Sequence, residues 1–352
     1  MTDDSMTAST NLPVRGDARR SWRELIAPYT AADPRRGLIQ LLNTGLPFLA
    51  LVAAMLAGTD HGFWAVLVLI APGAALLVRL FMIQHDCGHG SFFKSRWAND
   101  LLGRALGVLT LTPYDFWRAA HAVHHATTGN LDRRGVGDIS TLTVREYLSL
   151  PRWRRIGYRI YRHPLVLFGI GPAYQFLLRH RIPTGHPLRQ WRNWLSILGT
   201  NAALAAVVVA VALTIGLRPF LLSYVPVCML AASTGVWLFY VQHQFEGTYW
   251  APTQQWNFHA AAMEGSSFYD LPRFLHWVTG YIGFHHIHHL SSRIPNYRLR
   301  ECFKENPEMR QVTRISLWDS LRCPRLALWD ETARKLVSFG HLRRHSSAPR
   351  AP

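Results

Sequence analysis

Four long apolar runs restrict what this chain can fold into more than any other feature of its sequence. They cover residues 38–58, 62–83, 195–217 and 219–241, and each contains at least 21 residues. At about 1.5 Å per residue, a helix of that length crosses a hydrocarbon core of about 30 Å. The alternative is that the runs form buried helices of a soluble core, but four runs of this length favour a membrane. The sequence therefore predicts an all-α integral membrane protein with four transmembrane helices in two hairpins.

The rest of the chain divides around these runs. Residues 1–37 are polar and lack the apolar stretch of a signal peptide, so we expect a cytoplasmic N-terminal segment. We expect a membrane domain over residues 38–300 and a cytoplasmic C-terminal segment over residues 301–352. The apolar stretches 101–112 and 164–178 are too short to span a bilayer, and we interpret them as interfacial or partly buried helices.

The arginines predict the orientation of the chain in the membrane. The net charge of +17 would suit either nucleic acid or an anionic membrane surface. The stretch 145–192 contains ten arginines and one acidic residue, whereas the short turns at 59–61 and Arg218 contain one arginine between them. Arginine-rich loops stay in the cytoplasm, so we expect both termini and the whole 84–194 region on the cytoplasmic side of a bacterial inner membrane. The basic surface then faces membrane lipids and not nucleic acid, and Arg79, near the end of its run, should reach the headgroups.

Histidines form the second strong pattern, because they gather in three short segments. The eight clustered positions are His85, His89, His121, His124, His125, His285, His288 and His289. Spacings of three and four place side chains on one face of a helix. The first segment continues the cytoplasmic end of the second span and the third follows the fourth span, so all three can meet just below the membrane in a helical cap. His286 lies about 100° around the helix from His285 and should point elsewhere.

So many converging imidazoles predict a metal site. Imidazole binds Fe, Zn, Cu and Ni. A single tetrahedral zinc would use at most four ligands, so eight or nine indicate two ions or a heavily constrained site. His243, where the fourth span ends, is a ninth candidate, and the alternative for it is a polar residue at a helix end. Acidic residues that could orient the ligands also lie near the clusters, and no pattern selects among them: Asp86, Asp132, Asp138 and Glu246.

The other histidines and the cysteines follow no metal-binding pattern. We interpret His259 and His276 as interfacial residues, and five more histidines as surface residues: His163, His180, His186, His341 and His345. The four cysteines form neither a CxxC zinc pattern nor a disulfide framework. Cys87, inside the first cluster, is expected to be a packed small residue.

The order and sequence of the three boxes resemble those of a known family. HDCGH at 85–89, HAVHH at 121–125 and HHIHH at 285–289, on two membrane hairpins, closely resemble the integral membrane fatty acid desaturases. The resemblance covers roughly residues 40–300. The segments around the boxes look like bacterial acyl-lipid desaturases of the omega-6, or delta-12, type. Front-end desaturases differ, because their third box usually begins with Gln where this chain has His285, and they carry a fused cytochrome b5 domain whose haem motif is missing here.

This resemblance implies a function and a set of ligands. It implies a non-haem centre of two irons that uses O2 to remove hydrogen from two adjacent methylenes of a fatty acyl lipid, leaving a cis double bond. The implied metal ligands are His85, His89, His121, His124, His125, His285, His288 and His289, with His243 as the additional histidine after the last span. No electron-donor domain is recognisable, so the electrons should come from a separate protein such as a ferredoxin.

Two other functions stay open at this point. The first is a different oxidation by the same iron chemistry, such as hydroxylation of a fatty acid or another lipid, which the boxes do not distinguish from desaturation. The second is a non-catalytic metal-binding or metal-transporting membrane protein. Transporters need ionisable groups at mid-membrane, and the four runs contain almost none. The sequence does not indicate the double-bond position, the acyl carrier or the oligomeric state.

Overall fold

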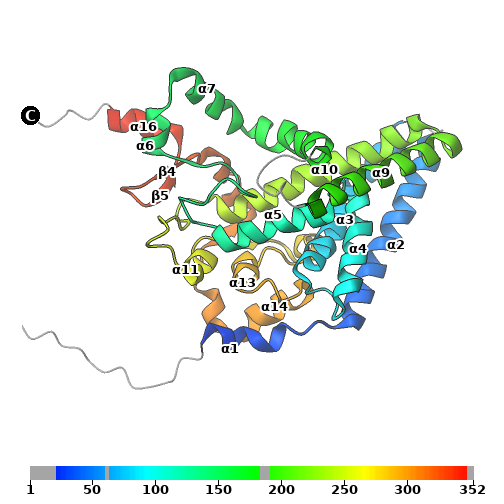
Figure 1. Cartoon of the computed structure of the whole chain (residues 1–352), viewed down its shortest axis with the longest axis horizontal. Helices are drawn as coiled ribbons and strands as arrows, with labels where there is room; N and C mark the ends of the chain where they lie inside the picture. Colours follow the sequence, from blue (N-terminus) through cyan, green and yellow to red (C-terminus); the bar gives the residue numbers. More distant parts are fainter. Residues whose placement is uncertain (1–20, 60–62, 183–190, 347–352) are drawn as a thin grey trace, which may run out of the picture.

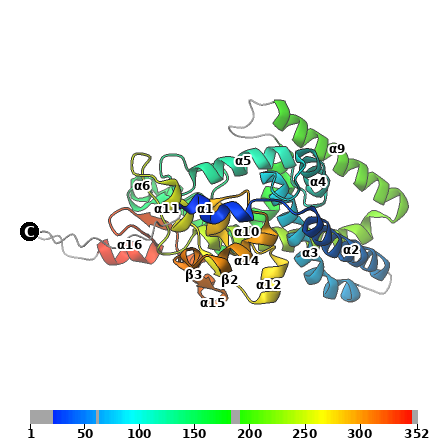
Figure 2. The same cartoon turned by 90° about the horizontal axis from the view of Figure 1, so that it is seen from below.

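The computed structural model describes residues 21–59, 63–182 and 191–346, and it is predominantly helical (Figure 1). Four helices are long and apolar enough to cross a membrane, which confirms the four predicted spans. They are α2 (Pro34–Gly58), α3 (Phe63–His89), α9 (Trp191–Thr214) and α10 (Leu217–His243). In Figures 1 and 2, α2 and α9 lie toward one end of the molecule, and the cap elements α6, α11 and α16 lie toward the other.

The ends of the spans differ from the predicted ones in ways that matter for the site. The helix α3 continues six residues beyond 83, and α10 continues to His243, so both carry histidines at their last turns. The second hairpin turns at Gly216 and not at Arg218, because Gly216 adopts φ +86°, a conformation that glycine reaches without steric cost. Arg218 is therefore already part of α10.

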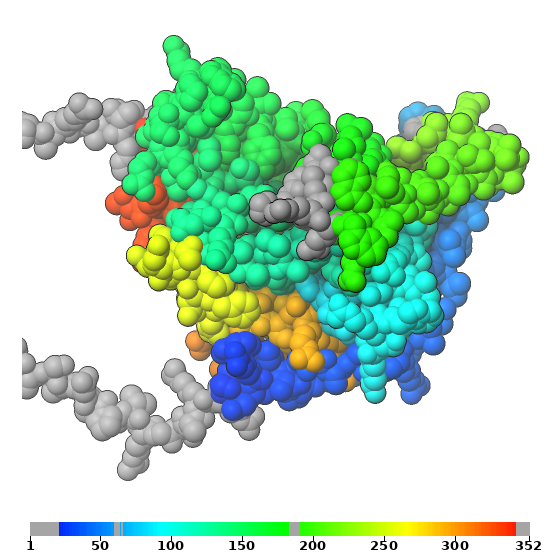
Figure 3. All heavy atoms as spheres, viewed as in Figure 1, coloured from blue at the N-terminus to red at the C-terminus, as the bar shows by residue number. Residues whose placement is uncertain are grey.

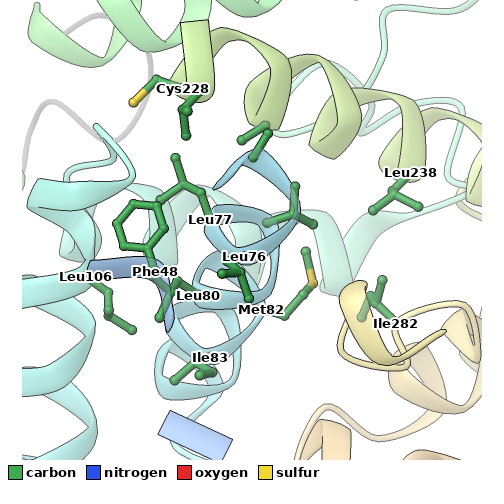
Figure 4. Packing of buried hydrophobic residues seen from close by; sticks show 14 of the residues in the cluster. Phe48, Leu76, Leu77, Leu80, Met82, Ile83, Leu106, Cys228, Leu238 and Ile282 are labelled. Atoms are coloured by element: carbon green, nitrogen blue, oxygen red, sulfur yellow. The ribbon is translucent and has the colours of Figure 1, made fainter. Parts of the chain in front are cut away.

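The helix α3 forms the centre of the membrane-spanning part. It packs against α2, α4 and α10, and most of its apolar side chains are buried, whereas those of α2 and α9 are mostly exposed. Figure 4 shows Leu77 and Leu80 of α3 between Phe48 of α2, Leu106 of α4 and Cys228 of α10. Because lipid tails are as apolar as leucine, close van der Waals packing holds such helices together. All four cysteines are buried free thiols, which confirms the packed position predicted for Cys87.

Arg79 corrects one prediction from the sequence. Its side chain does not reach the headgroups and is only 4% exposed. It donates hydrogen bonds to Oγ1 of Thr44, at 3.0 Å, and to the backbone carbonyl of Trp277, and its guanidinium lies 4.2 Å from the Trp277 ring centroid. The reason is that α3 extends ten residues beyond Arg79 and α12 packs over it. This arginine joins the spans to the cap.

The cap consists of short helices with two small sheets. Its helices are α1 (Trp22–Ile26), α4 (Arg96–Leu109), α5 (Tyr114–Thr127), α6 (Val144–Ser149), α7 (Arg152–Tyr161), α8 (Gly171–Ala173), α11 (Phe258–Met263), α12 (Arg273–Val278), α13 (His285–Leu290), α14 (Asn296–Glu305), α15 (Leu317–Ser320) and α16 (Phe339–Ser346). Two π-helical stretches, Val166–Ile170 and Tyr174–Leu178, flank α8. This segment and α4 match the two short apolar stretches that the sequence predicts to be partly buried or interfacial.

The sheets hold distant segments of the cap together. The strand β2 (Phe268–Asp270) pairs in parallel with β3 (Arg314–Ser316). In the second sheet, β4 (Leu328–Asp330) lies between β1 (Leu142–Thr143) and β5 (Lys335–Val337). The sequence predicted none of these strands, each at most three residues long. The second sheet fixes the C-terminal segment to the region before α6.

Candidate metal centre

Four helices bring the clustered histidines to one place. His85 and His89 are one turn apart at the end of α3, and His243 is the last residue of α10. The other six lie on two cap helices: α5 carries His121, His124 and His125, and α13 carries His285, His288 and His289. The third box is therefore a single short helix in which three of four histidines face inward.

The nine histidines form two adjacent groups, in each of which the ligand atoms lie within 4.8 Å of one another. The five-histidine group contains His85, His89, His121, His125 and His288, and the four-histidine group contains His124, His243, His285 and His289. Neither group contains a carboxylate or a thiolate. The structure thus brings together every sequence-predicted ligand, including His243, and it assigns five to one position and four to the other.

The side chains meet through their Nε2 atoms. In the five-histidine group, Nε2 of His121 lies 3.0 Å from Nε2 of His85 and 3.1 Å from Nε2 of His125. In the four-histidine group, Nε2 of His285 lies 2.9 Å from Nε2 of His243 and 3.1 Å from Nε2 of His289. Each group is therefore a small space lined by ring nitrogens.

The outer nitrogens show what this space requires. Nδ1 of His243 lies 3.0 Å from the carbonyl oxygen of Gly265, which can only accept, so Nδ1 carries the proton and Nε2 is a bare acceptor. A carboxylate at Asp138, 2.5 Å from Nδ1 of His124, has the same effect on His124. Yet the Nε2 atoms of these two histidines lie 3.2 Å apart. Two lone pairs facing each other repel unless a cation lies between them, so the donor set fits a metal ion.

Nε2 of His89 points to the same conclusion for the five-histidine group. It is buried and makes no hydrogen bond within the part of the chain that the structure describes. Buried polar atoms are normally paired, so this nitrogen also fits a metal ligand.

Two of the four candidate acids orient ligands and two do not. Oδ1 of Asp86 lies 3.2 Å from Nδ1 of His85, and its Oδ2 accepts a 2.6 Å hydrogen bond from the backbone N–H of Asn296. Asp138 contacts His124, as above. In contrast, Asp132 accepts from the backbone of Thr253, and Glu246 pairs with Lys335. The sequence could not separate these acids, because their partners are set by tertiary packing.

A glycine makes the contact between Asp138 and His124 possible. Gly137 adopts φ +72°, and a Cβ there would lie 3.1 Å from the backbone oxygen of Ala120 and 3.2 Å from Cβ of His124. A larger residue would be strained by the backbone conformation and crowded against α5. Gly137 thus lets the chain approach α5 closely enough for Asp138 to reach the ring.

Burial favours the neutral form of five of the clustered histidines on α5 and α13. Desolvation lowers the pKa of these imidazoles well below the usual range of histidine, and neighbouring imidazoles lower it further. The five residues are His121, His125, His285, His288 and His289. Neutral imidazole is the form that binds metals, so these residues need not lose a proton when a metal binds at neutral pH.

The remaining histidines occupy varied positions. His286 lies in neither group; its Nε2 is 2.9 Å from the carbonyl oxygen of Met309, as its place on the helix predicts. His163 and His259 are exposed, whereas His341 is half-buried beside Asp330. His186 and the side chain of His345 lie outside the described residues.

Two histidines contradict their predicted positions. His276 is not interfacial but buried, with its ring stacked 5.1 Å from that of Phe284. His180 is not a surface residue: it is 3% exposed, and its Nε2 lies 2.9 Å from Nε2 of Gln175. Burial lowers the pKa of His180 to about 3. The flanking arginines suggested a solvated segment, but Arg181 bonds the carbonyl of Leu111, which is 70 residues away.

An apolar cavity of about 620 Å³ adjoins both histidine groups, and no pattern in the sequence predicted it. His85 and His121 of the first group and His285 of the second line one part of its wall. Residues of α10 line it from Cys228 to Gln242, a distance of about 21 Å along the helix. Most of the remaining lining is apolar, and Gln175 and His180 add polar atoms. The cavity thus extends along α10 and reaches the histidines.

Comparisons with known proteins agree with this geometry. A family model described as "Fatty acid desaturase" matches residues 33–319. The chain is 43% identical over 314 residues to a "Fatty acid desaturase" of Bacillus subtilis, with 89% of each chain covered. It is 31% identical to an "sn-1 acyl-lipid omega-3 desaturase (ferredoxin)" of Synechocystis sp., covering 71% of this chain and 69% of the relative. It is 28% identical to an "sn-1 oleoyl-lipid 12-desaturase" of the same genus, covering 64% and 63%.

Proposed function

This chain belongs to the fatty acid desaturase family, and we propose that it uses O2 and two electrons to introduce a cis double bond into a lipid-linked acyl chain at a non-haem centre of two irons. The observation that carries the proposal is the position of the two histidine groups beside a long apolar cavity. Family membership identifies an oxidoreductase, which excludes a purely metal-binding or transporting role. The iron content, the double-bond position, the acyl carrier and the donor are parts of the proposal.

The residues that would hold the metals are the nine histidines. Five would hold one iron and four the other, with Asp86 and Asp138 orienting His85 and His124. Bound iron would supply the redox chemistry with O2 that an unactivated C–H bond requires and that zinc cannot supply. The protein contributes neutral imidazoles fixed in position by packing and by hydrogen bonds, which limits rearrangement around the centre.

The cavity would hold the acyl chain. Its volume lies within the usual range of ligand pockets, about 300–1,000 Å³. An extended polypeptide advances ~3.6 Å per residue over three backbone bonds, which is roughly 1.2 Å per bond, and an extended acyl chain is similar. The length of the cavity lined by α10 therefore accommodates about 17 bonds. For a chain that comes from the bilayer, close van der Waals packing against the apolar lining, and not transfer from water, would provide the contact. This apolar contact would hold the substrate against His85, His121 and His285.

The electron balance requires a donor. Dioxygen takes up four electrons when it is reduced to two waters, and breaking two C–H bonds supplies two of them. We propose that a separate ferredoxin supplies the other two, as the names of two relatives indicate for those proteins. We also propose that the termini and the centre face the cytoplasm of a bacterial inner membrane, in keeping with the arginine-rich 145–192 region.

We propose omega-6, or delta-12, desaturation, because the boxes resemble that type and a relative is named as a 12-desaturase. The test is expression in a host that contains oleate but no linoleate, followed by gas chromatography of lipid-derived fatty acids. Linoleate is the expected product; another diene would correct the position, and a hydroxy fatty acid would replace desaturation by hydroxylation. Metal analysis should give close to two irons per chain with little zinc. His124→Ala is the inactive control, and one zinc without iron in active protein would contradict the iron centre.

A further inference from the structure

Residues 152–182, which we call the wall segment, carry large apolar side chains on their outer surface. Figures 1 and 3 show this segment along the upper edge of the molecule, from α7 toward α9 and α10. Eight of its large apolar side chains are more than half exposed: Trp153, Ile156, Ile160, Leu165, Ile170, Tyr174, Leu178 and Ile182. The span α9 has comparable exposure at Leu195, Leu198 and Val209. Apolar surface of this extent marks a contact with lipid or with another protein.

Hydrogen bonds fix which face of α7 points outward. Nε of Arg155 donates to the carbonyl of Leu150 at 2.8 Å, and Nε of Arg159 donates to the Tyr147 hydroxyl at 2.7 Å. One turn later, Arg162 is buried and donates to the hydroxyl of Tyr240 in α10 at 2.8 Å. These arginines occupy the protein side of α7, so the face with Trp153, Ile156 and Ile160 must face away from the protein.

The end of the wall segment lies at the depth of a membrane span. Nη1 of Arg181 donates to Oδ1 of Asn201 at 3.0 Å, and Nδ2 of Asn201 donates to the carbonyl of Arg181 at 3.0 Å. Asn201 lies ten residues into α9, which is about 15 Å from the start of that helix at Trp191. The chain therefore descends from α7 toward the bilayer interior before α9 begins.

The inner side of the same segment forms one side of the cavity. Val166, Leu167, Gly171, Tyr174 and Gln175 line it, whereas Leu165, Ile170 and Leu178 face outward. A single layer of helix therefore separates the cavity from the outer surface. Its two π-helical stretches, Val166–Ile170 and Tyr174–Leu178, have the rare geometry that is frequent at functional sites.

We infer that the wall segment lies in the lipid leaflet on the cytoplasmic side of the membrane and that the acyl chain of a bilayer lipid enters the cavity through residues 165–178. The inference rests on the proposed function for the identity of the acyl chain. Bilayer lipid is the occupant of the outer face because that face continues the exposed surface of α9. The exposed arginines Arg152 and Arg154 at its start suit anionic headgroups.

The position of the wall can be tested without activity. Cysteines introduced at Ile156 and Leu177 would carry an environment-sensitive NBD fluorophore, and the buried native thiols leave the unmodified chain as the background control. The vesicles contain phosphatidylcholine and phosphatidylglycerol with brominated acyl chains. Leu198→Cys in α9 marks the bilayer, and Gln254→Cys, exposed before α11, marks water. Quenching at both wall positions like that at Leu198 is expected. Quenching like that at Gln254 would overturn the inference. Shielding of the fluorophores from lipid by a second copy of the protein would overturn it as well.

The entrance can be tested with two matched substitutions. Ile170→Asp places a charge on the outer face of the stretch that lines the cavity. Ile160→Asp places the same charge on the outer face of α7, away from the cavity. The unfavourable free energy of a charged side chain in the bilayer should slow lipid entrance about tenfold in Ile170→Asp. Turnover of vesicle-embedded lipid in Ile160→Asp should stay close to that of the unmodified protein.

Equal rates in the two variants would overturn the entrance. Metal content serves as the folding control, and Ile170→Asn replaces Ile170→Asp if the latter does not retain metal. If the fluorophores are quenched by lipid but no diene forms in any variant, the proposed function fails while the membrane position of the wall stands.

Discussion

The two histidine groups share α5 and α13 but differ in how far they are buried. All four members of the four-histidine group are buried, whereas three of the five members of the other group, His89, His121 and His125, are partly exposed. The ring-to-protein contacts differ as well. In the four-histidine group, His124 contacts Asp138 and His243 contacts a carbonyl. In the five-histidine group, Asp86 contacts His85 at a longer distance.

The difference follows from the way α5 lies between the groups. His121 and His125 are one turn apart on α5, and His124 lies about 100° around the helix from His125 and about 60° from His121, toward the four-histidine group. The chain that returns through Gly137 and Asp138 covers only the His124 side. The four-histidine group is therefore enclosed by protein, and the five-histidine group is partly open.

The largest expected effect comes from removing a ligand of the enclosed group. His243→Ala should abolish desaturation and lower iron content, as His124→Ala should, because either change removes both a bond and the fixed geometry of the site. His286→Ala removes a neighbour whose ring bonds Met309, and its effect should be milder. The measurements are diene yield and iron per chain at matched expression. Full activity of His243→Ala would remove that residue from the centre, and loss only in His286→Ala would contradict the orientation of α13.

The second effect compares the two orienting acids. Asp138→Asn and Asp86→Asn each keep the size of the side chain but weaken the hydrogen bond that holds a ring, which typically costs about 10–100-fold in metal affinity or activity. Asp138→Asn should have the greater effect, because its contact is the shorter one. Iron affinity and turnover should be measured for both.

Glutamate variants at the same positions provide a control for these acids. Partial rescue by Asp138→Glu would show that charge and reach matter there. A fall in protein yield without a change in metal affinity would contradict an orienting role for either acid.

The convergence of the nine histidines could be predicted from the sequence, but their division into a group of five and a group of four could not. Spacings of three and four predicted that the boxes would converge, and the end of the fourth span predicted that His243 would join them. The split into five and four depends on the rotation of α5 relative to α13, which is set by tertiary packing. The same reason explains Arg79, whose partner Trp277 is 198 residues away, and His180, whose surroundings come from the cavity. Local charge suggested exposure at both positions, and long-range contacts decided otherwise.

The third effect concerns metal removal. A chelator should take iron first from the five-histidine group, because His89, His121 and His125 are partly exposed and the other group is buried. We expect two phases of iron loss from purified protein, with the faster phase accounting for about half of the iron. Metal content against time and the spectrum of the residual iron would check this. A single phase, or a residual spectrum from mixed sites, would show that the difference in burial does not control access.

The smallest effect separates histidines that would bind metal from one that would not. Burial lowers the pKa of His286 to about 4, and it lowers the pKa of His121, His125 and His288 well below its usual range. A histidine whose folded pKa is depressed stabilises the fold above its unfolded pKa of about 6.5, and that stability is lost as pH falls toward the folded value.

Each such residue changes the free energy of unfolding by up to about 1.4 kcal/mol per pH unit in this window. Metal-free protein should therefore melt at progressively lower temperature between pH 6.5 and pH 4, as measured by circular dichroism of its helices. His286→Gln should flatten this slope by about one proton with or without iron, because its ring contacts Met309 and no ligand atom of either group. If bound iron also removed the contribution of His286 to the pH dependence of stability, this residue would be coupled to the centre. His286 would then belong with the two histidine groups and not with their surroundings.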